Sequence, residues 1–256
     1  MAKKAYIGVS GVARKIKKGY IGVNGVARKI KKAYIGIGGV ARPCWASGLE
    51  YYGTITALSV GRHSLAATTV GNYALFGGGR INASTNMGAT AVDAYNTSLT
   101  RSTPSALSVG RHSLAATTVG NYALFGGGVD YVSGNQYYTT VDAYNASLTR
   151  STPSALSVGR YLLAATTVGN YALFVGGRNN TSSSNNKYEK TVDAYNTSLT
   201  LSTPTALSEE ASGLAATTVG NYALFGGGGS TTSNHGATAV DAYNTSLTLS
   251  TPTALS

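Results

Sequence analysis

Short runs in which apolar residues alternate with small or polar ones occur along the whole chain, and glycine-containing dipeptides separate them. Alternation with a period of two is typical of strands with one buried face. Asn-Gly or Gly-Asn between two such runs favours a tight hairpin turn. No run approaches the roughly 18 apolar residues of a membrane-spanning helix. The pattern therefore predicts an all-β protein built from hairpins.

The first 46 residues repeat with a period of 14, from Ala5 to Lys18 and then twice more. With turns at Ser-Gly and Asn-Gly, Val9 faces Val12 across the first hairpin. A second turn type at Lys-Gly places Ile16 opposite Ile21 and keeps the two faces consistent. We predict an antiparallel β-meander of about six short strands, with one aliphatic face and one Tyr/Lys face.

So thin a sheet needs a partner on its aliphatic face. We therefore expect residues 1–46 to anchor the protein on other proteins or on copies of itself. The predicted anchoring interface consists of Ile7, Val9, Val12, Ile16, Ile21, Val23, Val26 and Ile30.

A second repeat, with a period near 49, fills residues 47–256. A Leu-Ala-Ala-Thr-Thr-Val-Gly-Asn-Tyr-Ala-Leu-Phe segment starts at Leu65 and returns at Leu114, Leu163 and Leu214. Each copy continues to a Val-Asp-Ala-Tyr-Asn segment and closes on Ser-Thr-Pro-Ser/Thr-Ala-Leu-Ser. The units lie near 62–110, 111–159, 160–210 and 211–256, and in the first we predict strands at 65–70, 73–76, 91–95 and 104–108. Such units bury a core only when they stack on one another.

These residues resemble the Kelch repeat: a strand ending in Gly-Gly, a variable loop, a Val-x-x-Tyr-Asn strand, a Pro-x-x-Leu segment and an Arg that opens the next unit. The resemblance implies a Kelch-like β-propeller in which each unit is one four-stranded blade. A sandwich or solenoid of duplicated hairpins is the alternative. The opening Arg is replaced by Ala211 in the fourth unit. Four units either close as a small ring or leave blade edges that pair between chains, and we favour association.

The charge is concentrated at the N-terminus. Eleven of the 20 Lys and Arg lie in the first 44 residues, which contain no Asp or Glu, so the net charge of +11 belongs to this segment. Interleaved tyrosines would allow phosphate and base contacts. The aliphatic face requires a protein partner in any case, so nucleic acid is the less favoured partner.

The same segment, ending in Gly-Val-Ala-Arg-Pro-Cys-Trp, resembles the N-terminal segments of tail-associated and other virion proteins of bacteriophages and prophages. The resemblance implies an anchor that places a variable display domain on a phage particle. We accordingly expect a virion location, after synthesis in the host bacterial cytoplasm without a signal peptide.

No candidate chemistry stands out. The one cysteine, Cys44, excludes an internal disulfide, and the histidines lack the spacing of a metal site. Asp93 and its three repeats stand two residues before a tyrosine, which we interpret as a blade-packing hydrogen bond. Asn-x-Ser/Thr sequences such as that at Asn96 are interpreted as turns. We predict no catalytic residue, no metal, no cofactor and no enzymatic activity.

The loops after the Gly-Gly strands differ between units while the framework is almost identical. Their Tyr, Asn, Ser and Gly content is typical of adaptable recognition loops. Unconstrained drift explains the variation equally well. The residues that we predict to bind a ligand are Asn82, Tyr131, Asn135, Tyr137, Tyr138, Asn179, Asn180 and Tyr188.

The favoured function is a non-enzymatic bacteriophage or prophage virion protein, with residues 1–46 docked on the particle and residues 47–256 displayed for host-surface or glycan binding. The alternative is a cytoplasmic Kelch-type protein-interaction module with an oligomerising N-terminus.

Overall fold

The computed structural model describes residues 6–9, 12–15, 19–23, 26–30, 32–37, 40–46, 53–82, 86–132, 134–179, 187–230 and 236–255. The chain divides into two compact units, Met1–Thr54 and Ile55–Ser256. In the described residues all regular structure is β, and no helix long and apolar enough to cross a membrane occurs there.

The first unit contains three hairpins. Their strands are β1 (Tyr6–Val9), β2 (Val12–Lys15), β3 (Gly19–Val23), β4 (Val26–Ile30), β5 (Lys32–Ile37) and β6 (Val40–Ala46). The predicted register is confirmed, since Val9 pairs with Val12 and Ile7 with Arg14. The described strands pair only within each hairpin, so they form three two-stranded sheets where we expected one continuous meander. Ile16, which was to join β2 to β3, lies outside the described residues.

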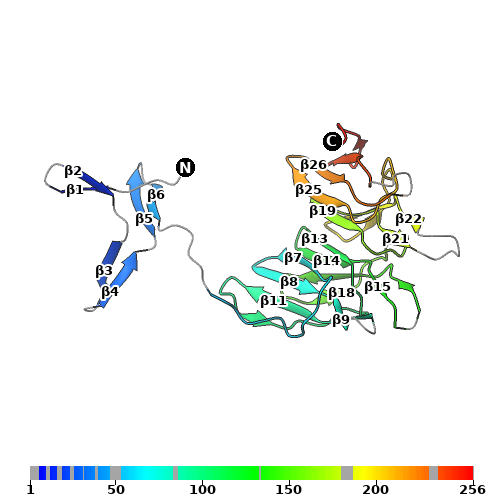
Figure 1. The fold of residues 1–256 in the computed structure, drawn as a ribbon, viewed down its shortest axis with the longest axis horizontal. Helices are drawn as coiled ribbons and strands as arrows, with labels where there is room; N and C mark the ends of the chain where they lie inside the picture. The colour runs from blue at the N-terminus through cyan, green and yellow to red at the C-terminus, as the bar shows by residue number, and fades with distance from the viewer. Residues whose placement is uncertain are drawn as a thin grey trace. The chain divides into compact units, whose positions relative to one another are not determined.

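The second unit contains four antiparallel sheets of four strands, one for each long repeat, and we call them blades 1 to 4. The first strands contact one another from blade to blade and are therefore the innermost. Figure 1 shows them following one another from β7 to β25. The four strands, in order from the inside, are β7 (Ala66–Val70), β8 (Tyr73–Gly77), β11 (Val92–Asn96) and β12 (Arg101–Ser102) in blade 1; β13 (Ala115–Val119), β14 (Tyr122–Gly126), β17 (Val141–Asn145) and β18 (Arg150–Ser151) in blade 2; β19 (Ala164–Val168), β20 (Tyr171–Val175), β23 (Val192–Asn196) and β24 (Leu201–Ser202) in blade 3; and β25 (Ala215–Val219), β26 (Tyr222–Gly226), β27 (Val240–Asn244) and β28 (Leu249–Ser250) in blade 4.

The predicted fourth strand at 104–108 is wrong. The outer strand is Arg101–Ser102, and the segment after it leaves the sheet. Pro104 has no N–H to give to a strand ladder, and the Leu107 amide donates to the Thr90 carbonyl instead. The segment therefore runs from one blade to the next, where its serine meets the following blade.

A repeated turn joins the third and fourth strands of each blade. In blade 2, the Asn145 side-chain oxygen accepts hydrogen bonds from the amides of Ser147 and Thr149, both at 3.0 Å. Leu148 between them has φ of 61°, a conformation uncommon for a leucine. The same bonds form at Asn96, Asn196 and Asn244, which confirms the interpretation of these sequences as turns.

Neighbouring blades bury their core between two unlike faces. One blade contributes a Val/Leu face, which in blade 1 contains Val70, Leu75 and Val92. The next contributes a Phe/Tyr face, which in blade 2 contains Phe125 and Tyr144. The two rings of that face pack edge to face, with centroids 5.9 Å apart. Three such interfaces lie between the four blades.

Short strand pairs follow the Gly-Gly sequences of blades 1 to 3. They are β9 (Arg80–Asn82) with β10 (Met87–Gly88), β15 (Val129–Asp130) with β16 (Gln136–Tyr137), and β21 (Arg178–Asn179) with β22 (Lys187–Tyr188). In blades 1 to 3 the described ends of each variable loop therefore pair as two short strands, and we call these three segments the loop hairpins.

Candidate functional site

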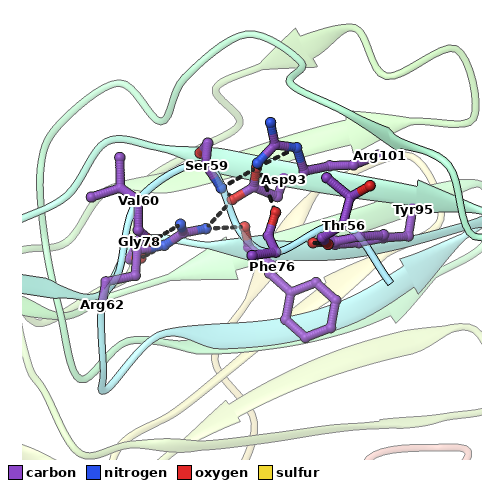
Figure 2. Close-up of polar contacts among 10 residues, drawn as sticks. Thr56, Ser59, Val60, Arg62, Phe76, Gly78, Asp93, Tyr95 and Arg101 are labelled. Atoms are coloured by element: carbon purple, nitrogen blue, oxygen red, sulfur yellow. Dashed lines mark hydrogen bonds and ion pairs between the residues drawn. The ribbon is translucent and has the colours of Figure 1, made fainter. Parts of the chain in front are cut away.

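Each of blades 1 to 3 contains a buried ion pair between the arginine that opens the unit and the aspartate of its third strand. Arg111 lies 2.8 Å from Asp142 of the same blade, and both side chains are fully buried. The Arg111 guanidinium also donates to the Phe125 carbonyl at the end of β14. Arg62 with Asp93 and Arg160 with Asp193 repeat this pair at 2.9 and 2.8 Å. Figure 2 shows the Arg62 pair with its backbone contacts.

The same carboxylate binds the segment that leads into its blade. Asp93 accepts from the backbone amide and the hydroxyl of Ser59, each at 3.1 Å, as Figure 2 shows. Two residues further along β11, the Tyr95 hydroxyl donates to the Thr56 carbonyl at 2.8 Å. Burial raises the pKa of Asp93, but hydrogen bonds from Arg62 and Ser59 and the Arg62 charge outweigh it, so the pKa lies below its usual value. The repeated Asp is a blade-packing residue, as predicted.

The fourth junction has no arginine, because Ala211 occupies that position. Asp241 still accepts from the backbone amide of Ser208, at 3.2 and 3.3 Å, and from its hydroxyl, at 3.1 Å. Burial raises its pKa above the usual value, Ser208 opposes this, and the Glu209 charge adds to it. Blade 4 therefore buries the same acid without its cation.

In blades 1 to 3 the residue that follows Arg62, Arg111 or Arg160 pairs through its backbone with the start of the variable loop. Backbone bridges join His63 to Arg80, His112 to Val129, and Tyr161 to Arg178. Side chains from the start of a unit and from its variable loop consequently lie together at one end of each blade. We call these side chains the aromatic band; its members are His63, Arg80, His112, Tyr131, Tyr137, Tyr161, Arg178 and Tyr188.

Ring contacts connect the band across the loops of blades 2 and 3. Tyr137 stacks on Tyr161 with centroids 5.6 Å apart and an interplanar angle of 21°. The His112 and Tyr131 rings lie 5.6 Å apart, and the Arg178 guanidinium lies 5.0 Å from the Tyr188 ring centre. Tyrosine faces and guanidinium groups provide rigid contact area and hydrogen bonds for polar ligands.

Burial and neighbouring groups perturb two members of the band. The pKa of His112 is lowered, first by burial and then by the Arg80 charge, with Asp130 acting in the opposite sense. The pKa of the Tyr131 hydroxyl is raised, mainly by burial and also by Tyr161, to which it is hydrogen-bonded. Both side chains are therefore neutral at pH 7, whereas Arg80 and Arg178 bring positive charge to the band.

The predicted ligand-binding residues have different environments. Tyr131, Tyr137, Tyr138 and Tyr188 are partly buried and Asn135 is exposed. Asn179 is buried and donates to the Glu189 carboxylate at 2.9 Å, so its amide is a framework contact in this structure. The side chain of Asn82 and all of Asn180 lie outside the described residues.

His112, Tyr161 and Arg178 were not among the predicted ligand-binding residues. A usable signal was present, because the residue after Arg62, Arg111 or Arg160 and the first residue after the Gly-Gly sequence both differ between units whose strands are nearly identical.

Two hollows are lined by residues of the band or by residues close to it in the chain. A cleft of about 630 Å³ lies at the junction of blades 3 and 4 and is lined in part by Tyr188, Glu189 and Glu209. A second hollow of about 270 Å³ is lined by the segments that precede the innermost strands, including Leu65, Leu114 and Leu163. Among the described residues, no group of three or more His, Cys, Asp or Glu side chains is placed to hold a metal ion.

Comparison with known proteins identifies the architecture. No protein-family model matches the chain, and no curated protein matches it in sequence. The solved structure titled "Structure of YjhT", a Kelch-repeat β-propeller, matches 79% of this chain and 68% of that chain with a TM-score of 0.62 at 14% sequence identity. The repeated four-stranded antiparallel sheets of residues 55–255 thus have the fold of a Kelch β-propeller.

Proposed function

We propose that this chain is a non-enzymatic binding protein of a bacteriophage or prophage virion, displayed so that the aromatic band binds a polar host-surface ligand such as a glycan. The band is the observation that carries this proposal. Most of its members lie in the variable loops, where units with nearly identical strands differ.

The framework supports this assignment because the residues that stabilise the blades are different from those of the proposed binding surface. Buried Arg-Asp pairs and the two packing faces hold the blades, and they use residues that repeat in blades 1 to 3. The loop hairpins change in sequence and in length without altering those contacts. Stacked tyrosines such as Tyr137 on Tyr161 lose little side-chain entropy on binding, since they are already ordered by each other.

The virion location is supported by the N-terminal repeats. Their hairpin register pairs Val9 with Val12 and Val23 with Val26. The resemblance of this segment to phage N-terminal segments gives the proposed docking partner, another virion protein. Immunogold labelling of purified particles tests the location, and absence from particles would leave the interaction-module alternative.

Glycan-array binding of the full chain tests recognition. We expect a Tyr131→Ala, Tyr188→Ala double variant to lose at least about tenfold in affinity, because central aromatic contacts typically contribute more than 1 kcal/mol each. Ile55→Ala is the control, since this side chain is 47% exposed and belongs neither to the band nor to blade 4. A soluble monovalent glycan should reproduce the difference. Equal affinity of both variants and the wild type would exclude the band as the binding surface.

A further inference from the structure

The two ends of the blade array expose residues that are buried everywhere else in it. Val219 on β25 is 59% exposed, whereas the equivalent Val70, Val119 and Val168 are each 1% exposed. Leu224 in blade 4 is likewise only partly buried, although its equivalents in blades 1 to 3 are fully enclosed. Blade 4 therefore presents an uncovered Val/Leu face.

Blade 1 presents the opposite face. Phe76 is partly exposed, whereas Phe125, Phe174 and Phe225 are at most 1% exposed. Ala67, which is paired with Phe76 on the neighbouring strand, is also exposed. Leu99 is 46% exposed, although its equivalents pack against the blade interfaces. These residues form an uncovered Phe/Tyr face.

The two faces are complementary, because glycines on the Val/Leu face leave space for the phenylalanine rings of the Phe/Tyr face. A Cβ on Gly77 would lie 2.8 Å from the Phe125 ring, and one on Gly126 would lie 2.8 Å from the Phe174 ring, so each of these two rings packs directly over a glycine. In blade 3 the equivalent position is Val175, which is buried in one core cluster with Phe225. At Gly226 of blade 4 the nearest contact is Val240, and no ring covers the position. Phe76 of blade 1 is the equivalent ring, and no glycine of another blade lies against it in the single chain.

A second glycine repeats the argument at the blade turn. A Cβ on Gly120 would lie 3.1 Å from Thr197 of the next blade, and one on Gly169 would lie 2.9 Å from Thr245. At Gly220 of blade 4 nothing lies within 4 Å. The equivalent threonine of blade 1 is Thr97, which is exposed.

Hydroxyl groups of the inner strands match in the same way. Thr68 bonds Thr118 at 2.9 Å, and Thr117 bonds Thr167 at 2.9 Å, so the first threonine of each blade meets the second threonine of the next. This ladder continues to Thr218 of blade 4. Its two unused positions are Thr217 on blade 4 and Thr69 on blade 1, both exposed.

We propose that the Val/Leu face of blade 4 packs against the Phe/Tyr face of blade 1 in a second copy of this chain, head to tail. The contact repeats the packing of strand faces that the chain already makes three times between its own blades. Residues 54–59 already occupy the place on Asp93 and Tyr95 that the segment arriving from the preceding blade takes at the internal interfaces, so the second copy contributes its strand face alone. A second copy is the occupant because its blade 1 supplies a ring at Phe76, a threonine at Thr97 and a hydroxyl at Thr69 in one rigid array. Two Val/Leu faces brought together would leave the space over their glycines unfilled. A heterologous contact of this kind closes into a ring or continues as a filament.

Complementation between two variants of the full chain tests the proposal. Val219→Asp removes the Val/Leu face of blade 4 but leaves blade 1 intact, and Ala67→Asp does the reverse. Both positions are exposed in the single chain, so neither change disturbs the folded blade. Sedimentation from about 1 µM to about 200 µM should show concentration-dependent association of the wild type and its loss in each variant.

An equimolar mixture of the two variants can form one head-to-tail contact and no more. We expect it to contain a species of twice the 26.1 kDa chain mass that neither variant forms alone. Val132→Asp, at a loop residue that is 53% exposed, should associate like the wild type. A wild type that remains monomeric over this range would overturn the proposal. Association that survives both substitutions would also overturn it, because the contact would then lie elsewhere, as in residues 1–46.

Discussion

Blades 2 and 4 have nearly the same strand sequences but different junctions. In blade 2 the buried carboxylate of Asp142 is paired with Arg111 at 2.8 Å. In blade 4 the arginine is replaced by Ala211, and the neighbouring residues are Glu209 and Glu210. Both blades nevertheless form the same four-stranded sheet. The ion pair is therefore not needed to form a blade, and we expect it to act on the stability of the blade instead.

The largest expected effect comes from breaking the pair where it is present. Arg160→Ala should lower the free energy of unfolding by about 3 to 5 kcal/mol, because it removes the cation that lies 2.8 Å from the buried carboxylate of Asp193. Blade 3 is the place for this test because Leu201 stands where blade 2 has Arg150, which lies 2.9 Å from Asp142 as a second cation. Urea denaturation with the same midpoint by fluorescence and circular dichroism measures this loss. Arg101→Ala is the control, since its side chain is 26% exposed and 3.8 Å from Asp93, and it should cost about 0 to 1 kcal/mol.

Restoring the pair in blade 4 should have a smaller effect of opposite sign. Ala211→Arg would give Asp241 the cation that its equivalents have, and we expect a gain of about 1 to 2 kcal/mol after the cost of burying the guanidinium. Ala211→Met adds a side chain of comparable length without charge and controls for packing. If arginine and methionine change the unfolding midpoint equally, the missing cation is not what distinguishes blade 4.

The buried carboxylates of blades 1 and 4 should also change the stability of the protein in opposite directions as the pH falls. The folded pKa of Asp93 is lowered, so its contribution to stability is present above the unfolded pKa and is lost as pH falls through the folded pKa. The folded pKa of Asp241 is raised, so its favourable contribution is present below the unfolded pKa and is lost as pH rises through the folded pKa.

Asparagine variants make this difference measurable. Asp93→Asn should lower the melting temperature at pH 7 and lower it less at acidic pH. Asp241→Asn should be better tolerated at pH 7 than Asp93→Asn, and it should lose that advantage relative to the wild type as the pH falls. Parallel pH dependences for the two variants would contradict the assigned pKa directions.

The repeats made much of this fold predictable from the sequence. The hairpin register at Val9 and Val12, the blade-packing Asp93 and the Asn96 turn follow from local patterns, because each is set by residues close in the chain or by one repeated contact. The outer strand was misplaced since Pro104 and Leu107 bond outside their own sheet. Open blade edges were one of the two predicted alternatives, but the residues that they expose could not be identified, because the Phe of an identical Phe-Gly sequence is buried in blade 2 and partly exposed in blade 1. Exposure there depends on whether a neighbouring blade exists.

The smallest predicted effect separates blades 3 and 4 at the loop surface. Blade 3 has Tyr161 where blade 4 has Ser212. Tyr161→Ser should cost about 0.5 to 1.5 kcal/mol, because Tyr137 loses the ring on which it stacks. Tyr137 was predicted from the sequence as a ligand-binding loop residue, a role that by itself implies no such cost. Tyr161→Phe keeps the stack and should melt within about 0.5 kcal/mol of the wild type. If serine and phenylalanine have equal melting temperatures, the stack contributes nothing to folding and the tyrosines are held only by their backbone.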